Sequence, residues 1–221
     1  MRVGASRGAR DRGGPSWRSA KAWVVLVIIV GASLFTDLAS KRWAFESIGE
    51  HPVQIERDLV LATPPDKLAV LLGEDARAVM RVIPNVLEFR LVLNSGAIFG
   101  AGQGMRTLFI AFTVVALLFA LWLFACRTRS GEWVAHGAIG FVIAGGIGNL
   151  YDRLVYGCVR DFIHPLPGVT WPGSDREVWP YVSNVADALL IVGIVILMIK
   201  LWRTEDGESS GAPTEPETNT G

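Results

Sequence analysis

The sequence predicts an all-α membrane protein, a four-transmembrane-helix bundle with a small extracytoplasmic β-sheet between the first and second spans. Three observations lead to this fold class. Of the 221 residues, 51% are hydrophobic, and the mean hydropathy of +0.38 is high for a soluble chain of this size. Four apolar segments are spaced along the chain. Between the first two lies a stretch in which apolar and polar residues alternate, as they do in a half-buried strand.

The four spans are expected at about residues 22–41, 107–126, 133–152 and 182–202. The second is the clearest, because its uncharged run is long enough to cross a hydrocarbon core of about 30 Å. The uncharged runs of the first and fourth are shorter. To span, their helices must include Asp37 and Asp187, respectively. Both carboxylates are therefore expected at or just below the membrane surface.

The first apolar segment also fits a cleaved signal peptide, since a basic stretch precedes it. The helical pattern continues through Asp37 and Lys41, however, and three more spans follow. We therefore expect residues 22–203 to form one four-span domain.

The distribution of positive charge predicts the orientation. Basic residues precede the first span, lie in the connection 127–132 and follow the fourth span. By the positive-inside rule these three places face the cytoplasm, so both termini are expected there. Residues 1–21 are expected to be a disordered basic tail, and residues 204–221 a disordered acidic tail.

The long loop 42–106 is expected outside the membrane and carries the β signal. Residues 86–93 alternate as in a strand and end at an Asn-Ser-Gly turn, whereas residues 64–82 predict a short helix. We expect a small sheet lying on the outer membrane surface.

Charge and cysteine content exclude several classes of function. Lys plus Arg and Asp plus Glu number 21 each, so no basic field for nucleic acid is present. Cys126 and Cys158 are expected at opposite ends of the membrane, without a disulfide. No Cys or His spacing suggests a metal site.

Polar residues converge at the outer ends of the predicted spans. Ionisable residues at membrane depth normally face a protein interior or a water-filled cavity. Within each helix these residues are spaced three or four apart and therefore share one face. They are Asp37 and Lys41 of the first span, Asn149, Asp152 and Arg153 of the third, Asn184 and Asp187 of the fourth, and Asn94 and Asp161 of the outer loops.

Most of these groups have an ordinary structural interpretation. Asp37 and Lys41 can finish a helix as an ion pair, Asn94 suits a turn, and the cluster of Asn149, Asp152 and Arg153 can tie helices together. The lone His136 and His164 are expected to be non-catalytic.

Asp161 and Asp187 are harder to explain in this way, because neither has a base at helical spacing on its own segment. Two carboxyl groups side by side share a proton. Such a pair can activate water with one member and protonate a leaving amine with the other. Spacing alone does not establish that these two residues meet.

Four motifs in order resemble those of the lipoprotein signal peptidases (signal peptidase II), four-span aspartic peptidases of bacterial membranes. The resemblance extends from Ala22 to Trp202. The motifs are TDLASK at 36–41, NSGAIFG at 94–100, GGIGNLYDRLVYGCVRDFI at 145–163 and SNVAD at 183–187.

The resemblance implies that Asp161 and Asp187 are the catalytic residues. It implies substrate-binding or supporting roles for Asn94, Gly96, Asn149, Arg153, Asn184, Asp37, Lys41 and Asp152. The implied substrates are prolipoproteins with a diacylglyceryl-Cys, cut just before that Cys without any cofactor. The implied location is the bacterial inner membrane, with lipid as a partner and the active site at the extracytoplasmic face. We expect a monomer.

The sequence departs from the family pattern at three places. Ile98 replaces an Ala, Ser183 replaces an aromatic residue, and residues 50–83 look like an insertion. We also hypothesise that the β segment and the NSGAIFG turn clamp the extended signal peptide.

Two functions of other classes remain as alternatives. The first is a small transporter or channel with an Asp/Arg relay, which would need polar groups across the whole bilayer. The second is an assembly protein with a polar lock between helices, which would tolerate Asp→Asn at 161 or 187.

Overall fold

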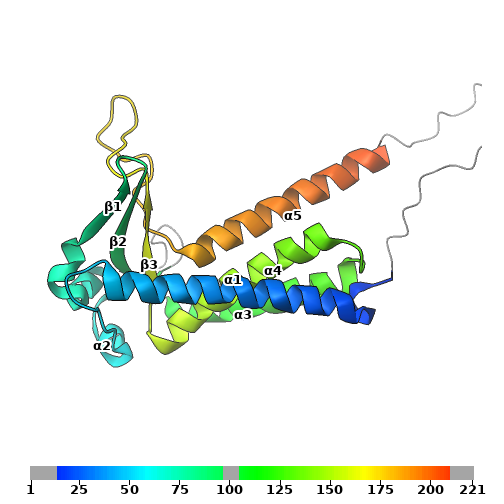
Figure 1. The fold of residues 1–221 in the computed structure, drawn as a ribbon, viewed down its shortest axis with the longest axis horizontal. Helices are drawn as coiled ribbons and strands as arrows, with labels where there is room; N and C mark the ends of the chain where they lie inside the picture. Colours follow the sequence, from blue (N-terminus) through cyan, green and yellow to red (C-terminus); the bar gives the residue numbers. More distant parts are fainter. Residues whose placement is uncertain (1–13, 97–104, 210–221) are drawn as a thin grey trace, which may run out of the picture.

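Four long apolar helices form the body of the molecule in the computed structural model, which describes residues 14–96 and 105–209 (Figure 1). Each is long and apolar enough to cross a membrane, so the predicted fold class is confirmed. The helices extend beyond the predicted spans at most of their ends. They are α1 (Ala20–Ser47), α3 (Arg106–Trp122) with its π-helical continuation η4 (Leu123–Arg127), α4 (Trp133–Val155) and α5 (Val185–Ser209).

Helix α4 lies at the centre of the bundle and contacts α1, α3 and α5. In the apolar 18-residue stretch of α4, 61% of the residues are buried, against at most 17% in the corresponding stretches of the other three helices. Helix α4 is also the least apolar of the four. Glycines allow α5 to approach it closely. A Cβ at Gly145 would lie 2.5 Å from the carbonyl oxygen of Ala186, and one at Gly193 would lie 2.6 Å from that of Ala138. Small residues at such contacts are typical of membrane helix packing.

A three-stranded antiparallel sheet lies at one end of the bundle, where α1 ends and α5 begins (Figure 1). Its strands are β1 (Val79–Ile83), β2 (Leu87–Asn94) and β3 (Val159–Pro165), in the order β1-β2-β3. Val92 of β2 pairs opposite Asp161 of β3. The sheet thus joins the loop before α3 to the chain that follows α4.

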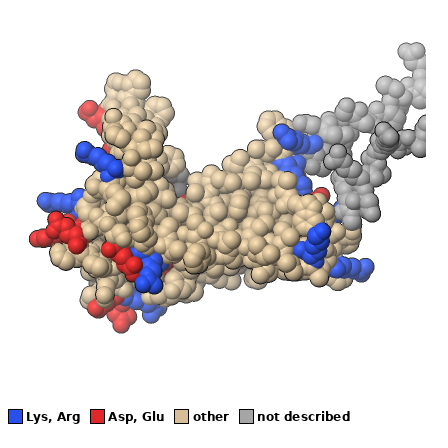
Figure 2. Space-filling view, viewed as in Figure 1, with Lys and Arg blue, Asp and Glu red and all other residues tan. Residues whose placement is uncertain are grey.

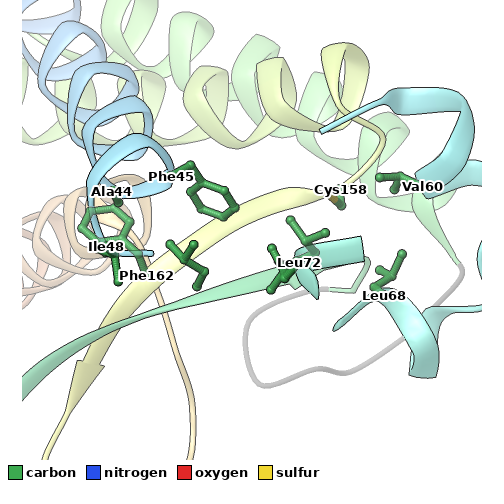
Figure 3. Packing of buried hydrophobic residues seen from close by; sticks show 10 residues of the cluster. Ala44, Phe45, Ile48, Val60, Leu68, Leu72, Cys158 and Phe162 are labelled. Atoms are coloured by element: carbon green, nitrogen blue, oxygen red, sulfur yellow. The ribbon is translucent and has the colours of Figure 1, made fainter. Parts of the chain in front are cut away.

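A hydrophobic core attaches this sheet to the end of α1 (Figure 3). Leu91 and Phe162 of the sheet pack there with Phe45 of α1. The short helix α2 (Arg57–Ala62) and the 3₁₀-helical η2 (Pro65–Arg77) complete the core with buried aliphatic side chains. The sheet is therefore fixed to the bundle by packing as well as by the chain.

The predicted strand at residues 86–93 is confirmed by β2, and the short helix predicted within 64–82 is confirmed in part by the 3₁₀ helix η2, which begins at Pro65. The helix ends at Arg77, and the last residues of the predicted range belong to strand β1, which begins at Val79 and pairs with β2. Gly73, with φ 60°, interrupts the helical backbone. Residues 159–165, expected to be loop, form β3, because pairing with β2 satisfies their backbone groups.

Both predicted tails include residues that lie in defined structure. The expectation of a disordered tail is wrong for residues 14–21, because Ser16 donates its N–H to the Thr128 carbonyl at 3.0 Å and is buried, and α1 begins at Ala20. It is also wrong for residues 204–209, which continue α5. The rest of both predicted tails, residues 1–13 and 210–221, lies outside the described residues.

The two cysteines are free, which confirms the prediction of no disulfide. Cys158 is buried in the core beside the sheet, whereas Cys126 is exposed in η4 near the opposite ends of the spans.

Candidate active site

The start of α5 is held by two side-chain acceptors. The backbone N–H of Asp187, the third residue of the helix, donates to Oδ1 of Asn184 at 3.0 Å, which is an N-cap bond. The N–H of Ala186 donates to Oδ1 of Asp37 on α1 at 2.8 Å. Both bonds satisfy N–H groups that the first turn of a helix leaves free. Together they fix the position of the Asp187 side chain.

Asp161 lies on β3 and receives two amide hydrogen bonds. Asn184 Nδ2 donates to its Oδ1 at 2.5 Å, and Asn94 Nδ2 donates to its Oδ2 at 2.9 Å. Asp161 is 1% exposed. Burial, followed by the nearby charge of Asp187, raises the pKa of Asp161 to about 8, although the bonds from the two asparagines act in the opposite direction. Burial thus favours the protonated form of this carboxyl group.

Asn149 on α4 completes a link between the two carboxyl groups. Its Nδ2 donates to Oδ1 of Asp187 at 2.8 Å, and its Oδ1 accepts from Nδ2 of Asn184 at 3.2 Å. A chain of hydrogen bonds thus runs from Asp161 through Asn184 and Asn149 to Asp187. The structure thus links Asp161 and Asp187, which lie on different elements. Their spacing in the sequence could not predict this link.

A buried ion pair supports this chain from α1. Lys41 and Asp37 are both fully buried, and their Nζ and Oδ2 atoms are 2.9 Å apart. The same Nζ lies 3.4 Å from Asp152 Oδ2 and donates to Asn149 Oδ1 at 3.1 Å. Buried charges must be paired and hydrogen-bonded, and this lysine meets that condition with three partners. The helix α1 thus contributes directly to the site, which argues against removal of this segment as a signal peptide.

Sequence reasoning missed Arg160, the second partner of Asp152. Its Nη2 and Nε donate to Asp152 Oδ1 at 2.9 and 3.2 Å, and its backbone N–H donates to Oδ2 at 3.0 Å. This interaction ties β3 to the end of α4. A charged residue directly before Asp161 in the chain was the only sequence signal for it.

The expected cluster of Asn149, Asp152 and Arg153 divides in the structure. Arg153 turns away from Asp152 and donates from Nη2 to the carbonyl oxygen of Gly96 at 2.8 Å. The N–H of Gly96 in turn donates to Oδ1 of Asn94 at 2.9 Å, as in an Asx turn. Arg153 thus holds the turn that aims Asn94 at Asp161. Residues 97–104, which include Ile98 and most of the proposed NSGAIFG clamp, lie outside the described residues.

Ser183 aligns Asn184 with the sheet through its backbone. Its carbonyl oxygen accepts from the N–H groups of Phe162 and Ile163, and its own N–H donates to the Ile163 carbonyl at 2.8 Å. The aromatic residue expected at this position is thus not needed for strand pairing.

A cavity of about 200 Å³ opens beside the polar chain, between α3, α4 and α5. Its polar end is formed by Asn94, Asn149, Arg153 and Asp187, and the remaining wall is mostly apolar. Within the described part of the chain no group of three or more His, Cys, Asp and Glu residues could hold a metal ion. The arrangement places the carboxyl group of Asp187 at the polar end of a mostly apolar cavity.

Four apolar helices of membrane-spanning length, with two buried carboxyl groups at one end of the bundle, define a multi-pass membrane protein. The model for the family described as signal peptidase (SPase) II matches residues 27–203, and the chain belongs to this family. It is therefore a peptidase of the membrane, and the predicted family is confirmed.

Individual relatives agree with this assignment. The lipoprotein signal peptidase of Halothermothrix orenii is 34% identical over 143 residues, which cover 63% of this chain and 89% of the relative. That of Streptococcus pyogenes is 34% identical over 137 residues, covering 62% and 80%. A solved structure of a bacterial membrane enzyme, obtained by the in meso method, shares the fold with a TM-score of 0.59 at 22% identity, covering 92% of this chain and 99% of that one.

Proposed function

We propose that this protein is an aspartic endopeptidase that removes signal peptides from diacylglyceryl-modified prolipoproteins, and that Asp161 and Asp187 are its catalytic residues. The observation that carries the proposal is the chain of hydrogen bonds from Asp161 through Asn184 and Asn149 to Asp187. Family membership supports the reaction, and this geometry supports the two carboxyl groups as its agents.

The two carboxyl groups share one proton in the resting site. The raised pKa of Asp161, about 8, favours Asp161 as its holder. Asp187 lies in the first turn of α5, where the helix dipole favours a negative charge. Asp187 therefore takes a proton from water, and the resulting hydroxide attacks the scissile carbonyl carbon while Asp161 donates a hydrogen bond to its oxygen. The leaving amine then takes a proton from the pair, which restores one shared proton.

The cavity beside Asp187 supports a lipid-modified substrate. Phe109, Phe112 and Leu117 of α3 and Leu190 of α5 make its wall apolar, and it lies along the spans. A substrate whose acyl chains stay in the bilayer keeps its scissile bond near the membrane surface. An active site at the ends of the spans reaches that bond without extracting the lipid. We propose cleavage just before the lipidated Cys.

The charge distribution supports an extracytoplasmic active site. Lys and Arg gather at the end of the bundle far from the sheet, whereas both signs of charge surround the sheet (Figure 2). By the positive-inside rule the first end faces the cytoplasm. We propose that both termini lie there, in a bacterial inner membrane. Because one chain supplies both carboxyl groups and the cavity, we propose that it acts as a monomer with lipid as its surroundings.

The depth of the charged groups disfavours a transporter or channel. Among the described residues, the fully buried charged side chains of the spans, Asp37, Lys41 and Asp152, belong to the site at the sheet end. An ion path would need such groups across the midplane.

Replacement of Asp161 or Asp187 by Asn tests the proposal. Each variant should accumulate uncleaved, lipid-modified precursor in cells and cleave none in reconstituted vesicles. Asp58→Asn, an exposed acid of α2 at the same end of the molecule, is the matched control and should process normally. Normal processing by either site variant would refute the carboxyl pair and support an assembly role.

A further inference from the structure

One face of strand β2 continues outward from the active site. Leu91 and Leu93 are buried in the core beside α1, and Phe89 packs against the same core. Successive side chains of a strand point to opposite faces, so Glu88, Arg90 and Asn94 lie on the other face. Asn94 is the residue that donates to Asp161. Arg90 and Glu88 therefore extend the active-site face away from the carboxyl pair.

A second cavity, of about 350 Å³, lies on this extension. Its charged lining comes from all three strands and from the loop after β3, namely Arg81, Glu88, Arg90, His164 and Glu177. Arg90 is four residues from Asn94, which corresponds to about 13 Å along a strand. An extended peptide lying over Asp161 would cover the same distance in about four residues.

The two acidic side chains of this cavity, Glu88 and Glu177, already have hydrogen-bond partners. Glu88 Oε1 lies 2.9 Å from Nδ1 of His164, and Glu177 accepts from the backbone N–H of Gly168 at 3.3 Å. His164 Nε2 lies 3.1 Å from the carbonyl oxygen of Trp179, which can only accept. Nε2 therefore carries a hydrogen, and the buried imidazole links β2, β3 and the loop after β3.

The two arginines, in contrast, form no ion pair with an acidic residue in the part of the chain that the structure describes. Arg81 pairs opposite Glu88 in the sheet register, yet Glu88 turns to His164, and no ion pair of either arginine occurs within residues 14–96 and 105–209. The Nε atom of Arg90 is buried without a hydrogen-bond partner in the same ranges. Two unpaired guanidinium groups beside engaged acids make the cavity a site for an anion. A carboxylate matches their forked geometry.

We propose that this cavity binds an acidic side chain of the mature part of the substrate, about four residues beyond the cleaved bond. The inference rests on the proposed function, since it takes the substrate to be a prolipoprotein. Three features follow one another in space: an apolar cavity within the spans, the carboxyl pair, and the charged cavity on the sheet. They match the order of an apolar signal peptide, a scissile bond and a polar mature segment.

The test uses lipid-modified precursor peptides that carry Glu, Gln or Lys at each of the positions from about two to six after the cut. The wild-type enzyme in phosphatidylcholine vesicles should show a higher kcat/KM for Glu than for Gln by about three- to tenfold, at about the fourth position only. Arg81→Gln and Arg90→Gln should abolish this ratio. Arg42→Gln, which removes an exposed charge of α1 at the same end of the molecule, should retain it.

A charge-reversal variant distinguishes loss of the subsite from misfolding of the protein. Arg90→Glu should prefer Lys over Glu at the position where the wild type prefers Glu. If the wild type cleaves all peptides with equal kcat/KM, or if the variants keep the Glu preference, the acidic subsite is refuted while the peptidase proposal stands. If no peptide is cleaved, the proposed function itself fails.

A phospholipid phosphate is the other anion that could reach these arginines, and vesicle composition separates the two. The assays are repeated in phosphatidylcholine mixed with phosphatidylglycerol. Arginine variants that lower cleavage of Glu and Gln peptides equally, and only in the mixed vesicles, would show headgroup binding and overturn the proposal.

Discussion

Lys41 donates from Nζ to Oδ1 of Asn149 at 3.1 Å, and this bond fixes the direction of the Asn149 amide. An ammonium group can only donate, so the oxygen of Asn149 must face Lys41 and its Nδ2 must face Asp187. The same logic fixes Asn184, whose Oδ1 accepts from a backbone N–H and whose Nδ2 therefore faces Asp161. Each carboxyl group thus receives an amide donor whose orientation is set from outside the pair.

Lys41→Met should remove both the orientation and the charge balance of this network. Asp37 and Asp152 would each lose a buried cation, and one such loss costs about 3–5 kcal/mol. We expect a large fall in the thermal unfolding temperature in detergent micelles and little remaining cleavage.

Arg42→Met is the control for this change, because Arg42 follows Lys41 directly in α1 but makes only an exposed pair with Glu46. Its effect on stability should stay within about 0.5 kcal/mol. Equal unfolding temperatures for the two variants would contradict the role given to Lys41.

Gly148→Ala should disturb the site through a steric clash alone. A Cβ at this position would collide with Oδ2 of Asp37, the atom that pairs with Lys41. We expect lower stability and lower kcat/KM, although alanine is the better helix former by about 1 kcal/mol.

Gly31→Ala provides the matched control, since a Cβ there meets no atom within 4 Å. This variant should unfold at the wild-type temperature or slightly above it and should cleave normally. If both alanine variants behave alike, the close approach of α4 to Asp37 is not required.

The spans and strand β2 could be predicted from the sequence because their signals are local. An uncharged run of membrane length and an alternating run each specify one kind of element, whatever the rest of the chain does. The start of the fourth span is less well specified: Asn184, expected inside it, instead precedes α5 and caps it.

The partners within the site could not be predicted, because they join residues far apart in sequence. Asp37 accepts from Ala186, 149 residues away, and Asn94 donates to Asp161 across 67 residues. Strand β3 depends on pairing with β2, and its sequence, VRDFIHP, has two charges and a proline that weaken the strand signal. The pairing of Asp152 with Arg160 depends likewise on β3, which carries Arg160.

The pH dependence of cleavage should reveal the proton on Asp161. Burial and the charge of Asp187 raise the pKa of Asp161 to about 8, so kcat/KM should fall as the pH rises through about 8. Because the two groups share a proton, this alkaline limb belongs to the pair. Hydrogen bonding from Asn94 lowers the pKa, so Asn94→Ala should shift the limb to higher pH. A wild-type profile that stays flat above pH 8 would contradict this assignment.

The same proton should affect stability. The folded protein binds it more tightly than the unfolded chain, whose Asp has a pKa near the usual 3.8. The contribution of Asp161 to stability is thus complete below pH 3.8 and is lost progressively as the pH rises to about 8. Asp161→Asn removes this titration, so the difference in unfolding temperature between variant and wild type should grow in favour of the variant over that window.

Arg160 and Asp152 should show strong energetic coupling. Asp152 is fully buried, and Arg160 reaches it with two side-chain donors and a backbone N–H. Arg160→Gln should destabilise the protein by about 2–4 kcal/mol, because among the described residues it leaves Asp152 with the Lys41 ammonium as its remaining side-chain cation. Arg160→Lys should restore little, since an ammonium cannot reproduce the two-donor contact.

A double-mutant cycle with Asp152→Asn measures this coupling through unfolding in detergent. The double variant should lose less stability than the sum of the single variants, by at least about 1 kcal/mol, because each single change leaves a buried charge without its partner. Additive effects would mean that β3 is held to α4 by the backbone bond alone. Since β3 carries Asp161, loss of the coupling should also lower kcat more than it raises KM, whereas a purely structural contact would leave the kinetics of the folded fraction unchanged.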